Sequence, residues 1–151
     1  MKIKAILQKP YNEIQRMDFI IEYNHNQGYT IEETATELQA LGYTEEEQAQ
    51  MEAERIAKLS LTRGDVFRGL LQARGVTRLM LREMIEGNEQ LTEIQKEMAL
   101  IDFDEALNFY RGNALIDTVG LALGISAEQL DKFFETNDYT HLVEKEVGFN
   151  A

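Results

Sequence analysis

The chain contains no cysteine among its 151 residues. A disulfide framework and a thiolate metal site are therefore both excluded, and the absence favours a reducing compartment such as the cytoplasm. Its two histidines, His25 and His141, lie far apart in the sequence and have no cysteine partner. We accordingly expect no metal site, no cofactor and no histidine-based catalytic dyad.

Long apolar runs are also missing. No segment approaches the roughly 20 apolar residues that a membrane span needs. Residues 1–10 carry only the apolar stretch 5–7, which is too short for the hydrophobic region of a signal peptide. The glycines at positions 64 and 69 lack the spacing of a phosphate-binding loop. These absences predict a soluble protein without membrane contact, and they give no sign of a small-molecule substrate.

The chain does contain an excess of negative charge, −12 in total. Such a charge opposes binding to a polyanion such as DNA or to an anionic lipid surface. The charges are unevenly distributed. Residues 1–60 contain 6 basic (Lys, Arg) and 11 acidic (Asp, Glu) residues, residues 61–82 contain 5 basic and 1 acidic, and residues 83–151 contain 4 basic and 15 acidic. A short cationic segment therefore lies between two acidic ones.

The apolar residues recur mostly at helical spacing, and at 44% of the chain they suffice for an independent core. No stretch shows the alternation expected of several strands. We predict an all-α fold, a compact bundle of short helices, with one short strand near residues 3–7. The predicted organisation is a separable N-terminal segment (1–42), an acidic connecting helix (43–60), a helical core domain (61–136) and a tail (137–151).

The N-terminal segment is predicted to contain a helix over residues 10–26, with the single proline of the chain in its first turn. Apolar residues at helical spacing define its expected buried stripe, which consists of Ile14, Met17 and Ile21 together with Phe19.

A short repeat follows, GYTIEE at 28–33 and GYTEEE at 42–47. In each copy a threonine and the glutamate three residues later can form a capping box directly after a glycine stop. We therefore predict two successive helix starts. The alternative is a small ubiquitin-associated-type module built around the turn Leu41-Gly42-Tyr43.

In the predicted core, capping residues and glycine stops delimit several short helices. One of them is expected to present Ile94, Met98 and Ile101 at helical spacing, followed by a shift of phase. The helix over 114–123 has a single charge, Asp117, and should be the most buried. The residues predicted to be buried in the core are Leu70, Met84, Leu115, Val119, Leu130 and Phe133.

Two nearby carboxylates, Asp102 and Asp104, could resemble the carboxylate pair of a hydrolase. A general acid, however, needs a raised pKa in an apolar pocket. A position at a helix junction is typical of capping instead, which is the interpretation we prefer. We expect no catalytic residues and no enzymatic activity.

The segment 122–130 resembles the turn of a helix-turn-helix, in which a glycine joins two short helices. A DNA-reading second helix usually offers Arg, Lys, Asn or Gln to phosphates and bases. Here that helix would offer Glu128, Asp131 and Glu135 against Lys132 alone. We prefer a simple helical corner and keep a DNA contact as the alternative.

The candidate docking residues are the five arginines of the cationic segment, Arg63, Arg68, Arg74, Arg78 and Arg82. They could pair with the protein's own acids, as a helical i,i+4 pair would allow. They could instead dock to an acidic protein partner or to the acidic block of another copy. Both hypotheses stay open, and nucleic acid is the less favoured partner.

The order of segments resembles a family of small helical accessory proteins of unknown function encoded in prophage tail-gene regions of Gram-positive bacteria. The resemblance lies in an acidic helix at 43–56, in LSLTR at 59–63, in FYRGNALI at 109–116 and in LGISAEQLDKFF at 123–134. The chain departs from the pattern at Gly112, where we expect a polar residue.

This resemblance implies a non-enzymatic accessory or structural protein that acts through protein contacts, with a protein partner or self-association. It also implies a place in the bacterial cytoplasm of a lysogen or infected cell, or in the virion. The alternative function is a DNA-associated regulator that uses the helix-turn-helix-like corner.

Overall fold

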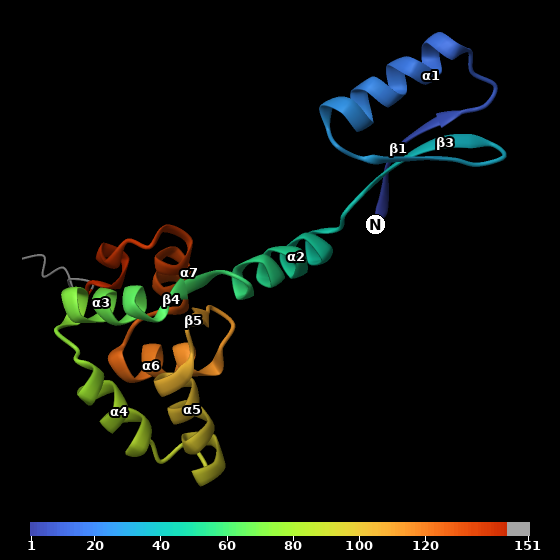
Figure 1. Cartoon of the computed structure of the whole chain (residues 1–151). Coiled ribbons are helices and arrows are strands. Elements are labelled where there is room, and N and C mark those ends of the chain that lie inside the picture. The colour runs from blue at the N-terminus through green and yellow to red at the C-terminus, as the bar shows by residue number, and fades with distance from the viewer. Residues whose placement is uncertain (145–151) are drawn as a thin grey trace, which may run out of the picture. The chain divides into compact units, whose positions relative to one another are not determined.

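The computed structural model describes residues 1–144 and divides the chain into two units, residues 1–53 and the part that begins at Glu54 (Figure 1). We call them the N-terminal unit and the C-terminal unit. The glutamate-rich helix α2 (Glu45–Ala57) crosses the boundary and buries none of its residues. Within residues 1–144, no helix has the length and apolar character needed to cross a membrane.

The N-terminal unit is a three-stranded antiparallel sheet with a helical segment across one face (Figure 1). Its elements are β1 (Lys2–Gln8), α1 (Glu13–Ile20), the π-helix η1 (Ile21–Asn26), β2 (Thr30–Glu33) and β3 (Glu37–Gly42). The strand order is β1-β3-β2, so β3 is central. Its Leu38 and Ala40 are fully buried and form the small core of this unit together with Phe19.

The predicted helix start after Gly28 is wrong. Gly28 does end the preceding helix, with a φ of +73°, but residues 30–33 then pair with β3 as strand β2. Thr34 holds the turn between these strands, because its Oγ1 accepts a hydrogen bond from the amide of Glu37 at 3.1 Å. The all-α prediction is therefore wrong for this segment, which contains three strands instead of one.

The second copy of the repeat behaves as predicted. The amide of Glu47 donates to Thr44 Oγ1 at 3.1 Å, and the amide of Thr44 donates to Glu47 Oε1 at 3.2 Å, which completes a capping box at the start of α2. The segment that leads into it belongs to a strand, since Leu41 and Gly42 pair with β1. The ubiquitin-associated-type alternative, which needs a helix before this turn, is therefore also wrong.

The buried face of α1 differs from the predicted stripe. Phe19 faces the sheet, and its ring packs against Tyr23 with a centroid distance of 4.7 Å. Ile14, Met17 and Ile21 instead lie on the exposed side. The helix carries apolar residues on two faces, and periodicity alone does not say which of them meets the sheet.

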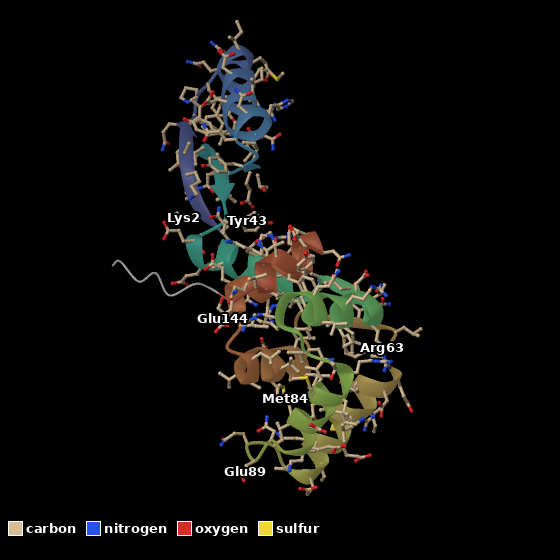
Figure 2. All side chains as sticks on the ribbon, turned by 90° about the vertical axis from the view of Figure 1, so that its left-hand side faces the viewer. Lys2, Tyr43, Arg63, Met84, Glu89 and Glu144 are labelled. Atoms are coloured by element: carbon tan, nitrogen blue, oxygen red, sulfur yellow. The ribbon has the colours of Figure 1, made fainter. Side chains whose placement is uncertain are left out.

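The C-terminal unit is mostly helical, as expected, but it also contains two short strands that the all-α prediction did not include. Its elements after α2 are β4 (Ser60–Thr62), α3 (Arg63–Arg74), α4 (Arg78–Glu86), α5 (Glu93–Glu105), β5 (Asn108–Tyr110), α6 (Ala114–Leu123), α7 (Ala127–Thr136) and the 3-10 helix η2 (Tyr139–Leu142). The strands β4 and β5 form a short antiparallel pair with Leu61 opposite Phe109. Helices α4 and α5 form a hairpin whose connection includes Glu89 (Figure 2).

Local capping delimits these helices, as predicted from the sequence. Gly75 and Gly124 end α3 and α6 in the left-handed conformation, with φ of +67° and +69°. The helix N-caps whose side chains accept a backbone hydrogen bond are Thr62, Thr77, Thr92, Asn113 and Ser126.

The core of the C-terminal unit is built mainly from side chains of the helices. A small apolar cavity of about 30 Å³ lies within it, lined in part by Val119 and Phe133. Most predicted core residues are buried, namely Leu70, Leu115, Leu130 and Phe133, whereas Met84 and Val119 are half-buried and pack on the same core. Part of the predicted tail also joins the core, because Leu142 is fully buried; residues 145–151 lie outside the described residues.

Candidate protein-docking groove

A surface groove of about 340 Å³ lies between α3 and the start of α4. The left-handed Gly75 turns the chain sharply after α3, and the cap at Thr77 then starts α4 against it. This geometry brings together the residues that line the groove, which are Gly64, Phe67, Arg68, Leu71, Val76, Thr77 and Arg78. We call this surface the arginine groove.

The floor of the arginine groove is apolar. Val76 is buried, Phe67 is half-buried and Leu71 remains 50% exposed. Phe67 is held in place by two neighbouring rings, Phe103 at a centroid distance of 5.1 Å and Phe109 at 5.8 Å. An apolar side chain from a partner would thus meet a preformed surface.

Two of the five candidate arginines, Arg68 and Arg78, line the arginine groove. Arg68 donates from Nη2 to Asp65 Oδ1 at 2.7 Å, yet its side chain is 67% exposed. The Arg68 guanidinium holds the pKa of the Asp65 carboxyl below its usual value. Arg78 is exposed and, among residues 1–144, makes no ion pair. Its charge is therefore available to a partner.

Arg63 and Arg82 do not line the groove and meet at Asp104, although the Arg63 guanidinium also lies 5.2 Å from the ring centroid of Phe67 on the groove floor. Arg63 donates to the backbone oxygen of Asp104, and Arg82 forms an ion pair with its carboxylate. Both guanidinium groups also lie over the ring of Phe103, at 5.9 Å and 5.5 Å from its centroid. The hydrogen bond with Asp104 raises the pKa of Arg82. A further contact with Glu86 at 3.7 Å forms the predicted i,i+4 pair.

Arg74 has a different environment again. Its Nε donates to the backbone oxygen of Leu142 at 2.7 Å, and its Nη1 donates to that of Leu123 at 3.0 Å. The guanidinium thus supplies donors to carbonyl groups at the ends of α6 and η2, where a cation is favourable. Arg74 ties three segments of the unit together.

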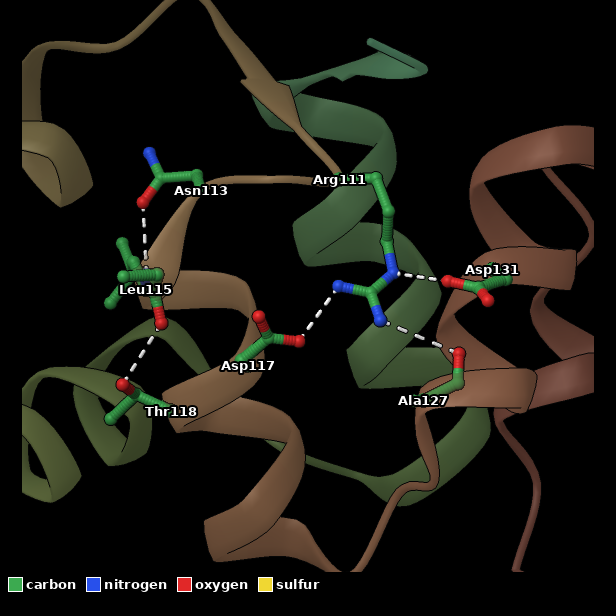
Figure 3. Close-up of polar contacts among 8 residues, drawn as sticks. Arg111, Asn113, Leu115, Asp117, Thr118, Ala127 and Asp131 are labelled. Atoms are coloured by element: carbon green, nitrogen blue, oxygen red, sulfur yellow. Dashed lines mark hydrogen bonds and ion pairs between the residues drawn. The ribbon is translucent and has the colours of Figure 1, made fainter. Parts of the chain in front are cut away.

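The sequence reasoning missed the polar centre of this unit, Arg111 (Figure 3). The whole residue is 7% exposed. Its guanidinium donates to Asp131 at 2.6 Å and to Asp117 at 2.7 Å. A weaker contact reaches the backbone oxygen of Ala127 at 3.5 Å. Burial alone would lower the pKa of Arg111, but the bonds to Asp117 and Asp131 outweigh it and raise the pKa. The lone charge in the apolar helix 114–123 was the one sequence signal for this cluster.

The α6–α7 corner exposes mostly acidic groups. Asp131 is engaged by Arg111, and Glu135 pairs with Arg55 at 3.0 Å. Lys132 lies 3.1 Å from Glu128 on the same helix. On α7 each of these carboxylates is thus paired with a cation, and the one basic residue of the helix, Lys132, is engaged as well.

The two histidines and the carboxylate Asp102 lie in different surroundings. His25 lies exposed in η1 of the N-terminal unit, and His141 lies in η2 of the C-terminal unit. Across residues 1–144, no three His, Cys, Asp or Glu side chains converge as a metal ion would require. Asp102 accepts a hydrogen bond from Asn113 at 3.3 Å.

Comparisons of the chain with family models, curated proteins and solved structures give no match.

Proposed function

We propose that the chain is a non-enzymatic, phage-type accessory protein that acts through protein contacts, and that the arginine groove binds an acidic segment of a protein partner. The observation that carries this proposal is an apolar floor bordered by a cation, Arg78, without an ion pair in the described residues. The resemblance to accessory proteins of prophage tail-gene regions supports the same class of function.

The chemistry of the groove defines what fits it. A carboxylate can pair with Arg78 at the rim while a neighbouring apolar side chain covers Phe67 and Leu71 on the floor. The protein as a whole carries a net charge of −12. An acidic segment is therefore repelled by most of its surface and attracted to the basic groove. Such electrostatic complementarity mainly raises the association rate and the specificity.

The proposal is tested with a fluorescent model peptide that has one leucine flanked by glutamates. We expect Arg78→Glu to weaken peptide binding by roughly tenfold or more at low salt, because it places like charges together. Lys132→Glu changes the net charge equally on the exposed face of α7 and is the matched control. Binding measured by fluorescence anisotropy should be nearly unchanged in that control.

Three outcomes would argue against this site. Equal loss in both variants would mean that only the net charge matters. Equal binding of a peptide in which glycine replaces the leucine would mean that the apolar floor is not used. Binding of a DNA duplex that is lost in Arg78→Glu and falls steeply with salt would favour the DNA-associated regulator instead.

A further inference from the structure

Helix α5 has two apolar faces, and one of them has no partner in the described part of the chain. Phe103 is buried in the core, with Ala99 and Leu100 packed beside it. On the other side Ile94, Met98 and Ile101 are 73%, 63% and 49% exposed. We call these three residues the outer stripe of α5.

The outer stripe is spaced as in a helix–helix contact. Its members are separated by four and three residues, the spacing with which one helix packs against another surface. Single exposed apolar residues are ordinary on protein surfaces, but three in one helical row form a continuous patch. The sequence pattern identified this row by its helical spacing, and the core is built on the opposite side of the helix.

The charges around the outer stripe are acidic. Glu97 lies next to Met98 in the sequence, is exposed, and has no ion pair within residues 1–144. The one cation of the helix, Lys96, is 19% exposed and lies 3.5 Å from Glu93. A surface that fits the outer stripe must therefore be apolar and basic.

The arginine groove has that character. We propose that the outer stripe of α5 in one copy docks into the arginine groove of a second copy, with Glu97 paired with Arg78. This inference rests on the proposed function, because it identifies the acidic partner of the groove as another copy of the same chain. The apolar floor at Phe67 and Leu71 would receive Ile94 and Met98.

The two surfaces belong to different parts of the C-terminal unit, which sets the symmetry of the contact. Figure 1 shows the α3–α4 turn and the lower part of α5 on different sides of α4. One copy can thus offer its groove to one neighbour and its outer stripe to another, a head-to-tail contact that produces rings or open chains of copies; a closed two-fold dimer would instead need two copies to exchange both contacts.

The contact is small. Three apolar side chains and one ion pair fall short of the roughly 800 Å² per partner of a standard stable interface. We therefore expect weak association that depends on protein concentration and salt, because exposed ion pairs are screened.

A charge swap tests the inference with the full chain. In sedimentation velocity at low salt, the average mass of the unaltered protein should rise with concentration. Arg78→Glu and Glu97→Lys should each weaken this association by roughly tenfold, because each places like charges together. An equimolar mixture of the two variants should recover it, since the altered residues then form an opposite pair. A mixture that stays monomeric overturns the inference.

An apolar substitution locates the contact on the outer stripe. Met98→Ser should abolish association, whereas Leu121→Ser should not, although Leu121 of α6 is still more exposed, at 85% against 63% for Met98. Association that is lost in Met98→Ser but retained in Arg78→Glu would reveal a symmetric α5–α5 contact and overturn the head-to-tail arrangement.

The proposed function can survive the failure of this inference. If the protein stays monomeric but binds the leucine–glutamate peptide through Arg78, the groove has another acidic partner and the self-association is refuted. If neither association nor peptide binding depends on Arg78, both proposals are refuted.

Discussion

The buried guanidinium of Arg111 allows a direct test of what stabilises the C-terminal unit. Its side chain is 9% exposed, whereas the carboxylates of Asp131 and Asp117 are 34% and 61% exposed. Replacing both aspartates with alanine would leave an unpaired cation inside the protein. Replacing the arginine would leave two carboxylates that water can reach. The two perturbations should therefore differ in their effect on the free energy of unfolding.

The magnitudes follow from the cost of an uncompensated buried charge. We expect D117A/D131A to destabilise the unit by about 3–5 kcal/mol, the cost of breaking a buried ion pair by removing one side of it. Arg111→Met keeps the aliphatic packing and removes the charge, so its effect should stay within about 1 kcal/mol. For a unit of this size, 1 kcal/mol moves the melting temperature by roughly 4–8 °C. The double variant should melt at least about 12 °C below the unaltered protein.

Thermal and urea unfolding followed by circular dichroism measure these differences at fixed pH. Lys132→Ala removes an exposed ion pair on the same helix as Asp131 and is the matched control, with an expected loss of about 0–1 kcal/mol. If Arg111→Met were as destabilised as D117A/D131A, the reasoning would be refuted. The hydrogen bonds and ion pairs of the cluster would then contribute net stability themselves, beyond preventing an unpaired buried charge.

Two further predictions concern α3. Gly69→Ala should destabilise the unit by about 1–3 kcal/mol despite the better helix propensity of alanine, because the new Cβ would lie 2.5 Å from Phe133 Cζ in the core; an unchanged urea midpoint would contradict this packing. The lowered pKa of Asp65 means that its carboxylate stabilises the folded state above its unfolded pKa and that this stabilisation is lost as the pH falls through the folded pKa. Asp65→Asn should therefore lose less stability than the unaltered protein as the pH falls below about 4, near the ordinary pKa of an aspartate, and parallel pH profiles in urea unfolding would refute this assignment.

The sequence predicted the C-terminal unit well because its signals are local. A threonine or serine cap and a left-handed glycine act on the residues beside them, so the starts of α3 and α7 and the C-terminal ends of α3 and α6 could be inferred without knowing the fold. The N-terminal sheet depends on pairing between β1 and β3, which are far apart in the chain. The motif TIEE fits both a helix start and a short strand. Its pairing with β3, which in turn pairs with β1, makes it a strand.

Local patterns also did not determine which apolar face of a helix is buried. In α1 and in α5, the more regular apolar row is exposed and a second, less regular set around Phe19 or Phe103 is buried. An aromatic ring buries more apolar area than an aliphatic side chain, so one phenylalanine can outweigh a row of isoleucine and methionine. The exposed rows then become candidates for contacts between molecules.

The arginine segment shows why charge counted along a sequence overstates charge on a surface. Arg63 and Arg82 are engaged at Asp104, and Arg74 bonds to backbone carbonyls of α6 and η2. Reversing Arg74 or Arg82 would therefore remove contacts within the unit, and a loss of binding in such a variant could not be separated from a loss of stability. Reversal of Arg78 removes no ion pair of the described residues. A change in association caused by Arg78→Glu at unchanged melting temperature would thus report on the arginine groove itself.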